Sequence, residues 1–293
     1  MPSWRGKSKG TPLGYRIFVA VLKNLGVFPA YFMLRFVAFY YFLFSWKSTT
    51  HSYHYFNRKL GYKRLKSLVN TYQNYYEFGQ SIIDKVVVMS GMPNKFTFDF
   101  DGEENLHQMV AMKKGGLLLS AHIGNWEIAG HLLKRLNTQI NIVMFDGENE
   151  QIKEYLSSVT GKMSVNVILI KNDLSHIYEI SEAFKNNELV CMHADRFMDG
   201  NKTLLCSFLD EAARFPMGPF VLAARFRVPV SFVFGMKESS LHYHFFASRV
   251  TDYSYLAKNE VMEKMLKDFV GAMEQKVKQY PRQWFNYYNF WQQ

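Results

Sequence analysis

The chain has 293 residues, of which 48% are hydrophobic and 17% aromatic, and it carries a formal net charge of +10. This length and apolar content suit one sizeable domain with a membrane-proximal extension. Two cysteines, Cys191 and Cys206, exclude a disulfide framework and indicate a reducing compartment. The charge bears on partners rather than on fold, and no nucleic-acid recognition motif accompanies it, so we expect no nucleic acid.

Residues 1–50 form a basic segment followed by an apolar one, which we interpret as a membrane anchor. Residues 1–26 hold five lysines and arginines and no acid, and residues 27–46 are apolar and long enough to span a bilayer. Their single charge, Arg35, costs about 2.5–3.5 kcal/mol in a bilayer centre, and their aromatic side chains favour the interface. The helix therefore spans the membrane or lies in its surface, with the basic segment cytoplasmic. No signal-peptide cleavage site follows, and a buried helix of the globular domain is the alternative.

Residues 47–70 add six basic residues and no acid. Each basic residue close to an anionic leaflet contributes about 1 kcal/mol, so the segment predicts contact with an anionic membrane surface. An acidic protein partner could bind the same charge, and a solvated helix face would have the same composition.

Residues 51–293 predict one α/β domain. Strands that alternate with helices indicate a mainly parallel central sheet flanked by helices. Residues 208–220 read as a loop that leads into a helix near Pro219. We expect further strands at 96–102, 117–122, 140–145, 165–170, 189–193 and 241–246, and helices at 71–95, 103–112, 148–160, 174–186 and 256–280.

The segment 115–130 holds the main candidate for catalysis. Two glycines precede a short apolar strand that ends at His122, and Asn125 is a fair N-cap for the helix that follows. Glu127 lies in the first turn of that helix, where it can reach back to the imidazole. No other histidine in the chain has an acid five positions later.

A histidine and a carboxylate in this setting predict general-base catalysis. A neutral imidazole can take a proton from a hydroxyl, and a carboxylate on its other nitrogen fixes the tautomer. We therefore assign His122 as the base and Glu127 as its orienting partner, acting directly on an acceptor hydroxyl without a covalent intermediate. A chance pairing in a structural turn is the alternative.

Further candidates for substrate binding are expected at the carboxyl edge of the sheet, where the strand before His122 also ends. Asp195 and Arg196 come just after a strand, and Arg196 could bind a phosphate or polarise an acyl carbonyl, or form a structural pair with Asp195. Arg214 is a second candidate for an anionic contact, or a surface residue. Gly218 leaves the backbone open to a ligand, and Asn125 completes the predicted set.

We expect no metal site. His242 and His244 share one face of a strand without a third ligand, and Cys191, His193 and Cys206 match no zinc spacing.

Four segments carry a resemblance to a known family. The sequence Ala-His-Ile-Gly-Asn-Trp-Glu at 121–127 resembles the His-x4-Asp/Glu block of the lysophospholipid acyltransferase superfamily, and in particular its lipid A lauroyl and myristoyl transferase branch. Later segments resemble that branch in the same order, and the whole covers about residues 105–290: His193–Arg196, Phe215–Pro219 with Val228–Val230, and Pro281–Trp284. Residues 76–85 are similar to a further branch associated with aryl-polyene pigments.

The resemblance implies an O-acyltransferase at the cytoplasmic face of the inner membrane, without metal or cofactor. The acyl group would come from an acyl carrier protein or coenzyme A thioester. The acceptor would be a lipid A precursor or a related glycolipid, with an aryl-polyene or amino-acid lipid as the alternative. Met217 stands where phospholipid acyltransferases usually have Glu, which points away from a glycerophosphate acceptor. A thioesterase and a non-catalytic partner in a lipid-synthesis complex are the alternatives of another class.

Overall fold

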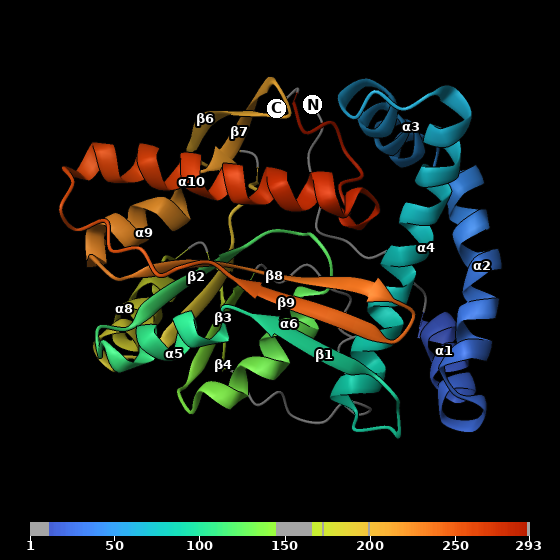
Figure 1. Ribbon diagram of the computed structural model, residues 1–293, viewed down its shortest axis with the longest axis horizontal. Helices are drawn as coiled ribbons and strands as arrows, with labels where there is room; N and C mark the ends of the chain where they lie inside the picture. The colour runs from blue at the N-terminus through green and yellow to red at the C-terminus, as the bar shows by residue number, and fades with distance from the viewer. Residues whose placement is uncertain (1–11, 145–165, 172, 199, 292–293) are drawn as a thin grey trace.

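The computed structural model describes residues 12–144, 166–171, 173–198 and 200–291 (Figure 1). Within them, seven strands form a central sheet in the order β1-β9-β8-β2-β5-β3-β4, and every neighbouring pair is parallel except β8 with β9. This confirms the predicted mainly parallel α/β sheet. The strands are β1 Thr97–Asp101, β2 Gly116–Ser120, β3 Ile140–Met144, β4 Asn166–Leu169, β5 Leu189–His193, β8 Val230–Ser239 and β9 His242–Ala247.

Strand β2 lies in the middle of this sheet and is covered on both faces. Its side chains Leu117, Leu118 and Leu119 are all 0% exposed, as expected of a continuous apolar run in a parallel sheet. Leu117 and Leu119 face one hydrophobic cluster and Leu118 faces another. The strand therefore fixes the position of the residues that follow it.

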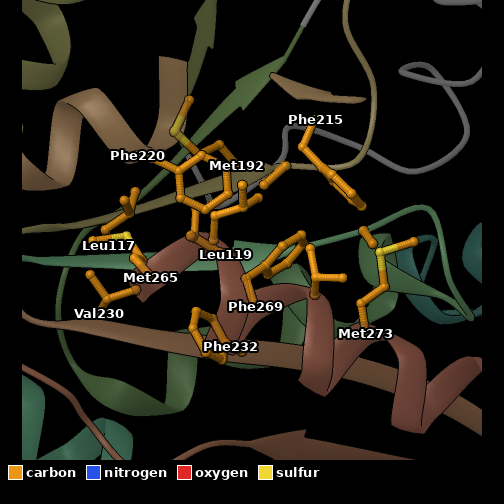
Figure 2. Packing of buried hydrophobic residues seen from close by; sticks show 14 of the residues in the cluster. Leu117, Leu119, Met192, Phe215, Phe220, Val230, Phe232, Met265, Phe269 and Met273 are labelled. Carbon is orange, nitrogen blue, oxygen red and sulfur yellow. The ribbon is translucent and has the colours of Figure 1, made fainter. Parts of the chain in front are cut away.

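Helices cover the two faces. On one face lie α8 (Ser175–Lys185), α9 (Gly218–Phe226) and α10 (Lys258–Gln279), and on the other α5 (Glu103–Ala111), α6 (Trp126–Leu132) and η2 (Leu133–Leu136). Helix α10 packs Met265, Phe269 and Met273 beneath Leu119 and Phe220 (Figure 2). The helix predicted at 256–280 is thereby confirmed, and the residues of its apolar stripe are at most 5% exposed: Val261, Met265, Leu266, Phe269, Met273 and Val277.

The N-terminal helices form a layer at one end of the sheet (Figure 1). They are α1 (Pro12–Leu25), α2 (Val27–Phe44), α3 (Trp46–His54), η1 (Tyr55–Lys59) and α4 (Arg64–Met89). Of the described helices, α2 is the one long and apolar enough to cross a membrane. One side of α2 is nevertheless buried, at Ala30, Tyr31, Leu34 and Ala38, and a Cβ on Gly79 of α4 would stand 2.4 Å from Leu34 Cδ1. Helix α2 thus packs closely on α4, and a domain boundary at residue 50 stays a prediction.

The predicted loop at 208–220 is wrong for its first part. Strands β6 (Thr203–Phe208) and β7 (Glu211–Pro216) form an antiparallel hairpin. Leu209 and Asp210 join them with φ values of 50° and 62°, the positive values of a two-residue hairpin turn. Leu-Asp is an unusual pair there, so the turn signal is weak. The helix expected at 148–160, and Arg5, Lys7 and Lys9, lie outside the described residues.

Candidate active site

The parallel register of β2 and β5 brings His122 beside Asp195. Ser120 is aligned with His193, and the chains continue side by side past both strand ends, where Ala194 N donates to Ser120 O at 2.9 Å. One Asp195 carboxylate oxygen accepts from the His122 backbone N–H at 3.0 Å, and the other lies 2.8 Å from His122 Nδ1. Because a carboxylate only accepts, Nδ1 carries the proton and Nε2 is the basic nitrogen.

The protonation states suit a base. Burial raises the pKa of Asp195, but the hydrogen bond and charge of His122 together with the Arg196 guanidinium hold it well below its usual range. Burial and the nearby Arg196 lower the pKa of His122, and the negative charges of Asp195 and Glu127 oppose them only in part. The imidazole is therefore neutral near pH 7 and, with its side chain 21% exposed, open to a substrate.

The predicted contact between Glu127 and the imidazole Nδ1 is corrected by this geometry. Asp195 occupies that nitrogen. Glu127 lies in the first turn of α6, and its two oxygens are 3.0 and 2.9 Å from Lys85 Nζ on α4. Glu127 lies on α6, which directs its side chain toward α4. Asp195 follows β5, the strand next to β2, and its carboxylate therefore lies beside the imidazole.

Arg196 joins the C-terminal segment to the site. Its Nη2 donates to Phe285 O at 2.6 Å, and Phe285 N donates to His122 O at 3.1 Å. Its Nε lies 3.9 Å from an Asp195 oxygen, and the side chain is 12% exposed. The predicted Asp195–Arg196 pair therefore lies beside His122, with one side of the guanidinium engaged by the protein backbone.

The other predicted binding residues are Asn125, Arg214 and Gly218. Asn125 caps α6 as predicted, since its Oδ1 accepts from Ile128 N at 3.3 Å, and the side chain is buried. Arg214 is exposed on β7 and donates to Thr203 Oγ1 at 3.3 Å. Gly218 begins α9 with open space around its Cα. Binding roles for Asn125, Arg214 and Gly218 stay predictions.

His193 was given no role at the site from the sequence: it was rejected as a metal ligand and named only as the first residue of the segment His193–Arg196. Its ring centroid lies 4.2 Å from that of His122 and 4.5 Å from the Trp126 ring. Burial, followed by the neighbouring His122, holds the pKa of His193 well below its usual range, so it is neutral. The sequence shows that two predicted strands end near a histidine, which was the available signal. It does not show that these strands, β2 and β5, are neighbours in the sheet.

The two strand histidines contact acids. His242 Nε2 lies 3.5 Å from Asp99, and His244 is 3.2 Å from both Asp101 and Glu238. In the part of the chain that the structure describes, no group of three or more His, Cys, Asp or Glu side chains is arranged to hold a metal ion.

Comparison with known proteins connects this geometry to an activity. The sequence model of a family described as "Bacterial lipid A biosynthesis acyltransferase" matches residues 68–293, which include every residue of the site. A phosphatidylinositol mannoside acyltransferase of Mycobacterium tuberculosis (strain ATCC 25618 / H37Rv) is 27% identical over 124 residues, which cover 42% of this chain and 39% of that protein. The match thus spans less than half of that relative's length.

Proposed function

Because the chain belongs to the bacterial lipid A biosynthesis acyltransferase family and is an acyltransferase, we propose that it transfers a fatty acyl group from a thioester to a hydroxyl of a lipid acceptor. The observation that carries this proposal is the His122–Asp195 pair, in which Nδ1 is bound to a buried carboxylate, so that Nε2 is the basic nitrogen. The donor would be an acyl carrier protein or coenzyme A thioester.

The reaction follows from this pair. His122 Nε2 takes the proton of the acceptor hydroxyl while the hydroxyl oxygen attacks the thioester carbonyl. The tetrahedral intermediate collapses, its C–S bond breaks, and the imidazolium returns the proton to the leaving thiolate. Asp195 stabilises the imidazolium in between. The ester forms without a covalent enzyme intermediate, and the mechanism uses no metal or cofactor.

The remaining site residues have secondary roles in this proposal. Glu127 stabilises the imidazolium through its charge rather than by a bond to Nδ1. Arg196 steadies the oxyanion or an anionic group of the donor through the positive charge of its guanidinium. Arg214 and Gly218 extend the binding surface, and Asn125 holds the start of α6.

A glycolipid is the acceptor we favour. The family is named for lipid A biosynthesis, and the mycobacterial relative is named for a phosphatidylinositol mannoside. Both acceptors carry sugar hydroxyls on a lipid, so a lipid A precursor or a related glycolipid is our first choice. An aryl-polyene or amino-acid lipid is the second.

We place this chemistry at a membrane surface, with α2 lying in the interface rather than crossing it. Helix α2 exposes large apolar residues, and by helical spacing Phe32, Phe36 and Leu43 lie opposite its buried side. Because one side of α2 packs on α4, lipid cannot surround the helix. Its outer side can still be buried in the membrane interface. The basic residues of 47–70 would then meet anionic headgroups on the cytoplasmic face of the inner membrane.

The test is a two-product assay with purified protein. Acyl carrier protein and coenzyme A thioesters are each offered with glycolipid acceptors in vesicles, and acylated lipid and free fatty acid are quantified by mass spectrometry. We expect acylated lipid from wild type and little from His122→Ala, with His107→Ala, an exposed histidine on α5, as the matched control. Free fatty acid without acylated lipid would establish a thioesterase instead. Equal product from His122→Ala would make the motif structural.

A further inference from the structure

Four polar side chains from four elements meet inside the protein, next to the apolar layer of α2 and α4. The Asp84 carboxylate, on α4, accepts hydrogen bonds from Tyr31 of α2 and from Tyr243 of β9, and it pairs with Lys237 Nζ of β8 at 2.5 Å. Lys237 Nζ also lies 2.7 Å from the Tyr31 hydroxyl. Asp84 is fully buried. A buried ion pair adds little net stability over apolar residues of the same volume, but it can fix one arrangement of the elements that supply it.

One connection from this cluster runs to the turn after His122. The Tyr243 hydroxyl donates to Asp84 and accepts from Asn125 Nδ2 at 3.3 Å. Asn125 is the N-cap of α6, and its Nδ2 also donates to Ser81 O on α4. The carboxylate is therefore linked through Tyr243 to the side chain that starts α6.

A second connection reaches the same turn through the C-terminal segment. Gln283 binds the Lys237 backbone twice, accepting from its N–H at 2.9 Å and donating to its carbonyl at 2.6 Å. The Gln283 carbonyl accepts from Gly124 N at 2.8 Å. Asp84 binds the side chain of Lys237 on β8, and Gln283 connects the backbone of Lys237 to Gly124. Asp84 is thus linked to Gly124 through β8.

We propose that Asp84 is a positioning residue for the catalytic turn His122–Asn125, acting on Asn125 through Tyr243 and on Gly124 through Lys237 and Gln283. The inference rests on the proposed function, in which His122 is the base. Two independent connections converge on adjacent residues, which is what a device that orients the imidazole requires. A cluster that only held α2 and α4 to the sheet would need neither connection.

Tyr243→Phe and Tyr31→Phe form a matched pair for the test. Each removes one hydroxyl that donates to Asp84, but only Tyr243 also accepts from Asn125. We expect Tyr243→Phe to lower kcat about tenfold with an unchanged KM, within the roughly 10²-fold that a misplaced catalytic group costs. Tyr31→Phe, which loses its contact with Lys237 Nζ but none with Asn125, should lower kcat less. Amide hydrogen exchange of the peptide that contains Gly124 and Asn125 should accelerate more in Tyr243→Phe than in Tyr31→Phe.

The exchange measurement decides the inference without a substrate. If exchange at this turn is the same in both variants, or if kcat falls equally in both and in step with the melting temperature, the cluster is a structural clamp and Asp84 positions nothing. A wild-type protein without transferase activity would instead overturn the proposed function alone, because the exchange result would still stand. Asp84→Asn, where it folds, should reproduce the exchange of Tyr243→Phe.

Discussion

Lys85 of α4 binds both carboxylate oxygens of Glu127, at 3.0 and 2.9 Å, beside the imidazole of His122. Glu127 therefore acts on His122 as part of an ion pair with Lys85. The negative charge of Glu127 raises the pKa of His122. The two residues of the pair should consequently shift the pH dependence in opposite directions.

Glu127→Gln removes the negative charge that stabilises the imidazolium, so the pKa of His122 falls. The acid limb of the kcat/KM profile should move to lower pH, because the base stays unprotonated further into the acid range. Lys85→Gln removes the positive charge and should move the same limb to higher pH. Profiles that shift in the same direction, or not at all, would show that the pair does not act on His122.

Asp195→Asn should be the more damaging substitution. The carboxylate accepts two hydrogen bonds from His122, one from its backbone N–H and one from Nδ1. An asparagine has one acceptor oxygen, so its amide group must face one of the two donors, which disturbs the tautomer. We expect kcat to fall about 10³- to 10⁴-fold, the size seen where a triad carboxylate is replaced. Asp99→Asn, at an exposed carboxylate on β1, is the control, and single-turnover acyl transfer is the measurement.

Gly124 should tolerate no side chain. Its φ is +65°, and an added Cβ would stand 2.0 Å from the Gly235 carbonyl oxygen. Gly91 has a φ of +66° with nothing within 4 Å. Gly91→Ala should therefore lower the free energy of unfolding only by the cost of the left-handed conformation, about 1–2 kcal/mol. Gly124→Ala should lower it by about a further 1–3 kcal/mol because of the clash. Denaturant melts of both variants measure the difference, and equal values would mean that the backbone around Gly124 relaxes freely.

Phe32 and Phe36 should contribute to vesicle binding. Their side chains are 59% and 65% exposed on the outer side of α2, and each aromatic side chain that enters lipid gains about 1.5–3 kcal/mol. Replacing both by serine should weaken binding to anionic vesicles about 10²-fold or more. Tyr178→Ser, at a 77% exposed tyrosine on α8, should bind as wild type does.

Salt separates the two contributions to that binding. Raising the ionic strength should weaken vesicle binding of wild type and of the double variant, because the basic residues of 47–70 act through screened charge. If wild-type binding depends neither on salt nor on the two phenylalanines, α2 is not the membrane contact.

Most elements were predictable because apolar periodicity is a local property. Leu117–Leu119 read as a buried strand, and the stripe from Val261 to Val277 reads as one helix face. The β6–β7 hairpin was missed because Leu209-Asp210 lacks the residues that favour positive φ. Where apolar periodicity or turn residues give a clear signal, the sequence alone is therefore enough to locate a helix or strand.

The partner of His122 could not be predicted in this way. Asp195 is 73 positions away in the chain, and only the pairing of β2 with β5 makes it a neighbour. Glu127 was the nearer acid in sequence, but the helix turns it toward Lys85. The Asp84 cluster is hidden for the same reason, since its members come from four separate elements.

The central claim is most directly tested by lipid mass spectrometry of a strain that lacks the gene and is complemented with wild type, His122→Ala, Asp195→Asn or His107→Ala. We expect one lipid class to lose a single acyl chain in the deletion strain. Wild type and His107→Ala should restore that chain, and His122→Ala and Asp195→Asn should not. Full restoration by His122→Ala would contradict the account, because the acyl transfer would then proceed without the proposed base.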